Sequence, residues 1–391
     1  MDERLLSGRA WDEFCDRLKA SGRRLLQDEF PDSPREIAEG YRHLARLTLI
    51  GLQWGTEFQD PEFPRFLRFE DDVTKVGGPN PDNTYLRAKI RGNGRYLIRG
   101  RLNGLRDLIV STPEGDMQLE QYGMFAKLDA SEIQADADGN FEILISAERE
   151  PGNWMPLHPD ADHVMIRQFF GDWESEGPAE FDIERLDREE LLPEPVAPGP
   201  FAERLDFAGE WIERSLVYWN RYTAEIRQQV GPNRFAPPAN AEGGEPDILY
   251  GNGFFELEDD QALIVETEPP DARYWSFQLY TIAWLESLDF AHRLTGLNHS
   301  QLRLDSDGRF RAVIAHRDPG VWNWLDTTGL REGLILYRWV WSGTAPTPSA
   351  RRVPFDAVRE HLPPDTPSVG PEERRAQLES RRRGIVRRFR R

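Results

Sequence analysis

The 391-residue sequence has little of what secreted or membrane-anchored proteins depend on. Cys15 is its single cysteine, which excludes an intramolecular disulfide and a zinc site built from cysteines. No apolar run approaches the roughly 18 residues that a membrane-spanning helix needs. The first residues also lack the basic-then-apolar order of a secretory signal. From these absences we predict a cytoplasmic protein without a membrane span.

The strong catalytic and nucleotide-binding motifs are missing as well. There is no Gly-x-Ser-x-Gly nucleophile elbow, no phosphate-binding loop that ends in Gly-Lys-Ser/Thr, and no His-Glu-x-x-His zinc motif. The glycines of residues 91–95 lack the third glycine of a dinucleotide-binding loop, which favours a turn between strands. We therefore expect an activity that uses no cofactor.

The charge of the chain is uneven. The formal net charge is −19, yet residues 374–391 contain nine arginines and one glutamate. An acidic body repels phosphate backbones, so we expect no nucleic-acid partner for the globular part. The basic tail alone is compatible with RNA or an anionic membrane, but we expect it to fold over the acidic body of its own or a neighbouring subunit.

The spacing of apolar residues divides the chain into helical and β parts. Residues 33–36 (Ser-Pro-Arg-Glu) are typical of a capped helix start. Alternating apolar residues indicate short strands in two regions, and spacing by three and four predicts a long helix over 202–230. The predicted parts are an N-terminal helical segment (1–60), a first β-sandwich domain (61–192), a linker with the long helix (193–247), a second β-sandwich domain (248–345) and a C-terminal tail with a basic helix (346–391).

The two β regions resemble each other. The matched segments, in order, are 95–102 with 273–280, 136–141 with 305–310, 151–155 with 319–325 after a two-residue insertion, and Arg167 with Arg338 in the closing strands. Several matches in one order indicate an internal duplication. We predict a mainly β protein with helical additions (α+β), built from two duplicated antiparallel β-sandwich or jelly-roll-like domains.

Two groups of residues resemble known families. Residues 79–85 (Pro-Asn-Pro-Asp-Asn-Thr-Tyr) are similar to the PN-x-D-T-x-Y segment of the domain-of-unknown-function family numbered 1254, although Asn83 separates Asp82 from Thr84. Tyr274-Trp275-Ser276, residues 316–320 and residues 323–325 resemble the family numbered 1214. The chain thus resembles a short form of the 1254–1214 tandem over roughly residues 75–345. The resemblance implies two β-sandwich or jelly-roll-like domains with helical additions, usually in a homo-oligomer, and no particular reaction.

Loop residues of the second β domain are the first candidates for chemistry. His316 is a candidate general base near neutral pH, with Asp318 or Asp326 to hold its tautomer. Asn323 and Trp324 are candidate substrate-binding residues in the wall of a pocket. The same residues also fit a tight Asp-Pro-Gly turn beside a core tryptophan.

Further candidates come from features found mainly in the second copy. His299 has no histidine at the matching place in the first copy, which makes it a candidate catalytic residue, with Tyr280 as a proton shuttle. The alternative for Tyr280 is an ordinary strand tyrosine. Tryptophans are concentrated in this half, which predicts either an apolar ligand cavity or an aromatic core. The candidate substrate-binding residues here are Trp275, Trp284 and Arg338.

A low-probability metal site is the cluster of His158, Asp160, Asp162 and His163. Two imidazoles and two carboxylates suit zinc, manganese or iron, but the same run suits an exposed loop. The leading hypothesis is a cofactor-independent enzyme that acts on a small hydrophobic or oxygenated organic substrate by His/Asp/Tyr acid–base chemistry. Its reaction would be of the hydratase/dehydratase (lyase), isomerase or hydrolase type. The alternative is a non-catalytic β-sandwich assembly protein that binds carbohydrate or protein.

Overall fold

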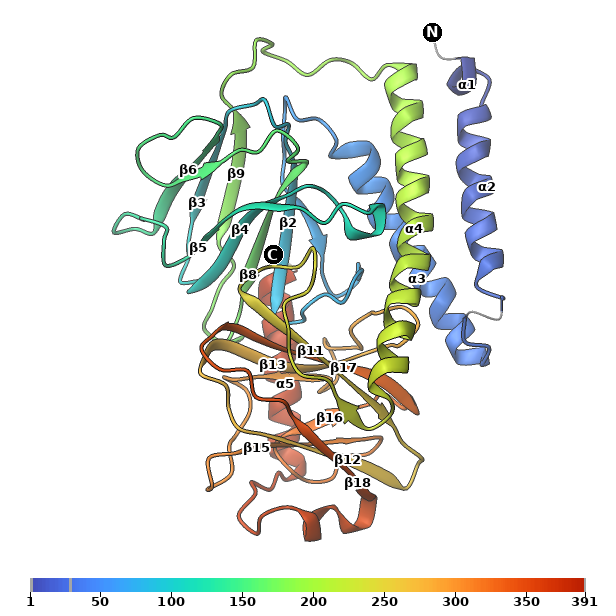
Figure 1. Ribbon diagram of the computed structural model, residues 1–391, viewed down its shortest axis with the longest axis vertical. Coiled ribbons are helices and arrows are strands. Elements are labelled where there is room, and N and C mark those ends of the chain that lie inside the picture. The colour runs from blue at the N-terminus through green and yellow to red at the C-terminus, as the bar shows by residue number, and fades with distance from the viewer. Residues whose placement is uncertain (1–2, 28–29, 390–391) are drawn as a thin grey trace. The chain divides into compact units, whose positions relative to one another are not determined.

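A computed structural model describes residues 3–27 and 30–389 (Figure 1). The remaining residues of the predicted N-terminal segment and basic tail lie outside this description. The chain divides into two compact units. Unit 1 comprises Met1–Val76, Asn83–Phe170 and Glu176–Trp219, and unit 2 comprises Gly77–Asp82, Gly171–Ser175 and Asn220–Arg391. The six residues 77–82 therefore belong to unit 2 although unit 1 residues flank them.

Helix α3 of unit 1 begins where the sequence predicts a cap. Ser33 Oγ accepts a hydrogen bond from the backbone N–H of Glu36 at 3.2 Å, which confirms the predicted helix start. A Cβ on Gly51 would lie 2.5 Å from Ile212 Cγ1, so only glycine permits this approach of α3 to α4. None of the described helices is long and apolar enough to cross a membrane. The helices are α1 (Glu3–Leu6), α2 (Arg9–Arg24), α3 (Pro34–Leu52) with a π-helical turn (Gln53–Glu57), and α4 (Pro198–Val230), which continues into unit 2.

Unit 1 contains two β-sheets. The first, in spatial order, consists of β1 (Leu67–Glu70), β2 (Asn83–Lys89), β8 (His163–Phe169), β4 (Asp107–Pro113) and β5 (Met124–Asp129). The second consists of β7 (Trp154–Pro156), β6 (Asn140–Ser146), β3 (Tyr96–Arg101) and β9 (Glu180–Arg185). Pairing is antiparallel except between β6 and β7. A short 3-10 helix (Met117–Leu119) lies between β4 and β5.

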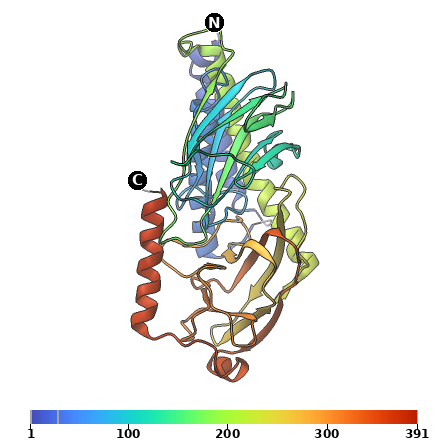
Figure 2. The ribbon, with the colours of Figure 1, turned by 90° about the vertical axis from the view of Figure 1, so that its left-hand side faces the viewer.

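Unit 2 repeats this arrangement. Its first sheet consists of β10 (Arg234–Phe235), β11 (Ile248–Glu256), β17 (Glu332–Ser342), β13 (Ala272–Tyr280) and β14 (Gly296–Asn298). Its second consists of β16 (Trp324–Asp326), β15 (Phe310–Ala315), β12 (Gln261–Thr267) and β18 (Ser349–Pro354). A 3-10 helix (Phe355–His361) and the long basic helix α5 (Pro371–Phe389, red in Figure 2) complete the unit.

The strand orders confirm the duplication and correct one predicted match. In both units the strands of the two sheets follow the same spatial order, so β8 corresponds to β17 and β4 to β13. The segments 136–141 and 305–310 lead into equivalent strands, β6 and β15. The match of 95–102 with 273–280 is wrong, because β3 occupies the position of β12, not of β13. That match depended on an Arg-Tyr pair at each segment start, a local likeness that does not report which strands are neighbours.

A shared asparagine contact shows how close the two copies remain. In unit 1, Asn153 Nδ2 donates to the carbonyls of Gln134 (2.9 Å) and Glu142 (2.8 Å). In unit 2, Asn323 Nδ2 donates in the same way to the carbonyls of Arg303 (2.6 Å) and Arg311 (2.7 Å). Because the same contact recurs in both units, the amide of Asn323 serves the scaffold.

The core of unit 2 fills the space between its sheets with aromatic side chains. Trp275, Phe277, Tyr337 and Trp339 are at most 6% exposed. Their rings lie edge-on, tilted or stacked at close range, for example 4.8 Å between the centroids of Tyr337 and Trp339. The predicted substrate-binding residue Trp275 packs inside this cluster, 5.8 Å from Trp339.

Candidate functional site

Strand β13 has two buried faces of opposite character. Trp275, Phe277 and Leu279 point into the aromatic core, so the residues between them point to the other side of the sheet. These alternate residues are polar, yet they are at most 1% exposed: Tyr274, Ser276, Gln278 and Tyr280. A buried polar face must find hydrogen-bond partners, and segment 77–82 supplies several of them.

Asp82 is the centre of this polar network. Its Oδ2 accepts hydrogen bonds from the Tyr274 hydroxyl (2.6 Å) and from Gln278 Nε2 (2.7 Å). Its Oδ1 accepts hydrogen bonds from Trp173 Nε1 (2.8 Å) and Asn298 Nδ2 (2.9 Å). The side chain is 2% exposed, so four donors replace the water that a carboxylate loses on burial.

The network continues along β13 and β17. Arg338 donates to Gln278 Oε1 (2.9 Å) and to the Tyr280 hydroxyl (3.0 Å). It also donates to the carbonyl of Gly78 (2.5 Å), and the Tyr280 hydroxyl donates to that of Pro79 (2.8 Å). The predicted site residues Tyr280 and Arg338 thus meet in one cluster, where they hold segment 77–82.

The buried phenols of unit 2 have shifted acidities. Burial, together with the negative charge of Asp82, raises the pKa of Tyr274 well above its usual value. Burial also raises the pKa of Tyr337. The neutral phenol is therefore the form that the folded state favours.

We expect the free energy of unfolding to fall in alkaline solution. A raised folded-state pKa contributes stability that is fully present below the unfolded pKa of about 10 and is lost as the pH rises through the folded pKa. Phenolate absorbance should show Tyr274 and Tyr337 ionising only as the chain unfolds, and Tyr274→Phe should make the alkaline loss shallower. Ionisation of all ten tyrosines near the ordinary pKa in a still-folded chain would contradict this.

A pocket of about 450 Å³ adjoins the network. Trp173 joins the two, because its ring lines the pocket while its Nε1 donates to Asp82. Leu294 and Leu297 give the pocket an apolar wall, and Arg381 of α5 supplies a charged one. This volume lies within the range of about 300–1,000 Å³ that small-molecule sites occupy.

His299 stands next to the wall of this pocket. The half-buried imidazole packs edge-on against Tyr274, with 5.7 Å between ring centroids. A Cβ on Gly171, which lines the pocket, would lie 3.1 Å from Ser300 Oγ and 3.4 Å from His299 Nε2. The glycine therefore leaves space beside the imidazole edge.

The other predicted catalytic residues, His316, Asp318 and Asp326, each have different hydrogen-bond partners. His316 Nδ1 lies 2.7 Å from Thr327 Oγ1, and its Nε2 lies 3.3 Å from the carbonyl of Leu257. In the described chain, neither predicted carboxylate hydrogen-bonds to His316. Asp318 accepts a hydrogen bond from Arg374 (2.8 Å), and Asp326 accepts one from Arg293 (2.8 Å).

The remaining predicted binding residues are buried. Trp324 Nε1 donates to the carbonyl of Ala315 at 3.2 Å, and the side chain packs in the apolar cluster beneath β15 and β18. Trp284 is 3% exposed. Among the predicted residues, Tyr280 and Arg338 belong to the polar network, and His299 lies beside the pocket.

The histidines of the predicted metal cluster occupy different surroundings. His158 stacks on Phe125, with 3.8 Å between ring centroids. His163 is fully buried, which lowers its pKa, and its Nδ1 lies 3.1 Å from Asp162. Within residues 3–27 and 30–389, no group of His, Cys, Asp and Glu side chains is arranged to hold a metal ion.

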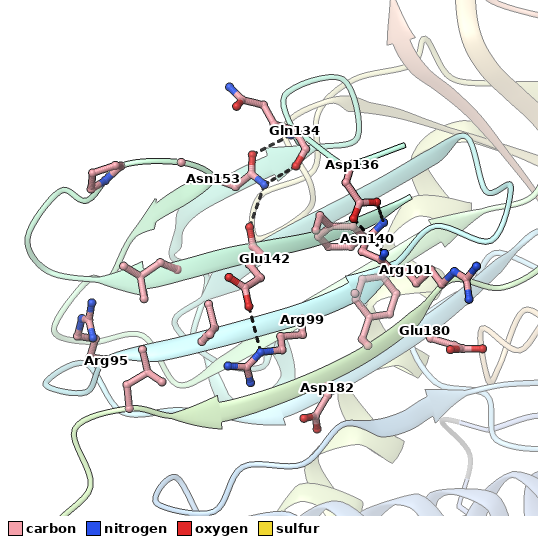
Figure 3. A pocket seen from close by; sticks show the side chains of 18 residues that line it. Arg95, Arg99, Arg101, Gln134, Asp136, Asn140, Glu142, Asn153, Glu180 and Asp182 are labelled. Atoms are coloured by element: carbon pink, nitrogen blue, oxygen red, sulfur yellow. Dashed lines mark hydrogen bonds and ion pairs between the residues drawn. The ribbon is translucent and has the colours of Figure 1, made fainter. Parts of the chain in front are cut away.

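Unit 1 has an open groove of about 1,070 Å³ over β3, β6 and β9 (Figure 3). Arg99 of the groove lies 3.1 Å from Glu142, which also lines it, and 2.6 Å from Glu184 of β9. None of the described residues that line the groove is a tryptophan. Its aromatic lining residues are Phe141, which is 5% exposed, and Phe181.

Several residues of the site were not predicted as site residues from the sequence, among them Trp173, Asn298 and Arg381. Trp173 and Asn298 occur in segments without a catalytic motif. For Arg381 one signal was available, because Arg374, Arg381 and Arg388 recur every seven residues and so share one helix face. All three are buried.

The fold defines a duplicated β-sandwich protein with helical additions, and comparisons with known proteins identify its family. The model for "Protein of unknown function (DUF1214)" matches residues 112–171 and 256–339. The crystal structure of an uncharacterized protein from Burkholderia cenocepacia is 34% identical, with a TM-score of 0.86, and the match covers 91% of this chain and 100% of that one. The chain belongs to the DUF1214 family.

A more distant solved structure is the VPA0106 protein from Vibrio parahaemolyticus. It is 12% identical, with a TM-score of 0.47, over 81% of this chain and 98% of that one. No functionally curated protein matches the chain. The likeness to family 1254 rests on residues 79–85 alone.

Proposed function

We propose that this chain is an enzyme that acts on a small oxygenated organic molecule in the pocket of unit 2, by acid–base chemistry of the hydratase/dehydratase, isomerase or hydrolase type. The observation that supports this is the position of His299. Its half-buried imidazole lies beside the pocket at Gly171 and Ser300. An imidazole is the side chain best suited to proton transfer near neutral pH.

Tyr274 and Asp82 act as positioning residues in this proposal. The Tyr274 ring packs against His299, and the Tyr274 hydroxyl is fixed by its hydrogen bond to Asp82. A catalytic group works efficiently only when its own support is rigid, because small displacements cost much of the rate. The network thus favours a fixed imidazole over one that swings freely.

His299→Gln is expected to reduce turnover by about 10²–10⁴-fold, the range typical of general acid–base groups. The assay incubates the full chain with hydroxy acids, unsaturated acids, lactones and esters, and follows products and deuterium uptake from D₂O by NMR. His316→Gln is the matched control, since His316 makes its contacts away from the pocket, and its turnover should stay near the wild-type value.

Full turnover by His299→Gln would remove the central residue of the proposal. Absence of product and of deuterium uptake across the whole panel would favour the non-catalytic alternative. A cytoplasmic homo-oligomer remains part of the proposal, and sedimentation of the purified chain measures its subunit number.

A further inference from the structure

Arg381 is a buried cation with few partners. Its side chain is 5% exposed, on the face of α5 that packs into unit 2. Its guanidinium donates to the carbonyl of Gly296 and lies over the Trp173 ring, 4.6 Å from the centroid. Asp82 and Asp289 are near enough to favour its charge, but among the described residues no carboxylate forms an ion pair with it. Most of the donors of this guanidinium are therefore not used by the protein.

Arg374, one heptad earlier on the same helix, shows how a buried arginine is ordinarily satisfied. Its guanidinium forms a two-pronged ion pair with Asp318, at 2.8 and 3.0 Å, and also donates to the carbonyl of Val321. A buried charge without such a partner is costly. The difference between the two arginines indicates that a partner for Arg381 comes from outside the chain.

The acidic residues that line the pocket already form hydrogen bonds or ion pairs with other residues of the chain. Glu174 accepts a hydrogen bond from Ser380 and lies 3.7 Å from Arg383. Glu373 accepts one from the N–H of Gly370 (2.9 Å), and Asp172 accepts one from Ser175 (2.5 Å). These three carboxylates are exposed, whereas Arg381 is the buried charge in the wall.

We propose that the pocket binds the oxyanion group of an organic molecule, a carboxylate or a phosphate ester, at Arg381. The planar fork of a guanidinium matches both groups with paired hydrogen bonds. The apolar remainder of the molecule would lie along Trp173, Leu294 and Leu297. The inference rests on the proposed function for calling this molecule the substrate, but anion binding is measurable without turnover.

The charge of Arg381 persists at neutral pH. Burial lowers the pKa of Arg381 to about 10, which is still well above neutrality. The affinity for an anion should therefore be steady through neutral pH and should decline as the pH passes about 10. A bound anion opposes this decline because it favours the charged guanidinium.

The test titrates the full chain with benzoate, phenyl phosphate and the neutral analogue benzamide, followed by tryptophan fluorescence and calorimetry. At least one of the two anions should bind about tenfold more tightly than benzamide, and Arg381→Met should lose about tenfold or more of that affinity. The stronger anion identifies the group as carboxylate or phosphate. Arg375→Met removes the same charge from an exposed position on α5 and should leave the affinity unchanged.

The unfolding midpoint of Arg381→Met distinguishes an anion-binding role of Arg381 from a structural role. Arg381→Met should unfold at the wild-type midpoint or above it, because it removes a buried charge that lacks an ion pair. If Arg381→Met does not fold, Arg381→Lys keeps the charge without the fork and should show weakened anion binding. Equal binding of benzoate, phenyl phosphate and benzamide, or unchanged affinity in both variants, would overturn the inference. Anion binding without turnover would contradict only the proposed function, and turnover of neutral compounds without anion binding would contradict only this inference.

Discussion

Asp82→Ala is expected to destabilise unit 2 by about 4 kcal/mol or more, because each buried donor left without an acceptor costs about 1–3 kcal/mol. The substitution removes one acceptor from each of four such donors, on Tyr274, Gln278, Asn298 and Trp173. The donors on Tyr274 and Gln278 also reach Asn80 Oδ1, at 3.2 and 2.6 Å. A loss of this size is a large part of the stability of an ordinary domain. We therefore expect the variant to unfold well below the wild-type temperature or to accumulate as insoluble protein.

The measurement is calorimetric unfolding with near-ultraviolet circular dichroism. Asp259→Ala is the control, because Asp259 is exposed in the turn between β11 and β12 and should change little. Asp82→Asn keeps the shape of the side chain but turns one acceptor into a donor. Its stability should therefore lie between that of Asp82→Ala and that of Asp259→Ala. An Asp82→Ala variant with wild-type stability would show that the network contributes nothing to the fold.

Trp339→Ala should cost about 3–5 kcal/mol, the usual range for removing a large buried aromatic side chain. Trp339 is fully buried, and its ring lies 5.4 Å from Phe277 and 4.8 Å from Tyr337, measured between centroids. Its Nε1 also donates to the carbonyl of Pro346, and truncation leaves that carbonyl unpaired. Chemical denaturation measures the change.

Trp11→Ala is the matched control for this substitution. Trp11 is 53% exposed on α2, so its removal should cost far less. If Trp339→Ala were as mild as Trp11→Ala, the aromatic residues between the sheets of unit 2 would line an empty cavity, as one interpretation of the sequence predicted.

The sequence predicted the architecture because strands and helices leave local patterns. The alternation along residues 272–280 fixes which side chains share a face of β13. The repeated Asp-Gly turns and the paired Arg167 and Arg338 revealed the duplication. Strand neighbours are set by hydrogen bonds across the sheet, which explains why 95–102 was matched to the wrong strand.

The site was harder to predict from the sequence because its residues are distant from one another along the chain. Asp82 and Tyr274 are 192 residues apart, and Arg388 donates to the carbonyl of Pro81 across 307 residues. Tyr280 and Arg338 were predicted as site residues, but nothing local associates them with Pro79 or Gly78. His316 was predicted as a catalytic residue because it precedes a turn motif. Its two hydrogen-bond contacts are with Thr327 and Leu257, and no sequence motif connects these residues to it.

The basic tail illustrates the difference between composition and position. Its nine arginines predicted attraction to an acidic surface. The helix instead buries Arg374, Arg381 and Arg388 at regular intervals and leaves arginines such as Arg375 and Arg382 exposed. Charge counting treats these residues alike, although burial changes both their cost and their chemistry.

Residues 77–82 leave the ribosome nearly two hundred residues before β13 exists. Until β13 is synthesised, segment 77–82 lacks the side chains that bind it. Closing so long a loop slows the assembly of unit 2. A chain cut within α4 would give an amino-terminal fragment that carries two segments of unit 2, residues 77–82 and Gly171–Ser175. The two fragments should therefore fold when they are expressed together, and the carboxyl-terminal fragment expressed alone should lack the partners that these two segments supply.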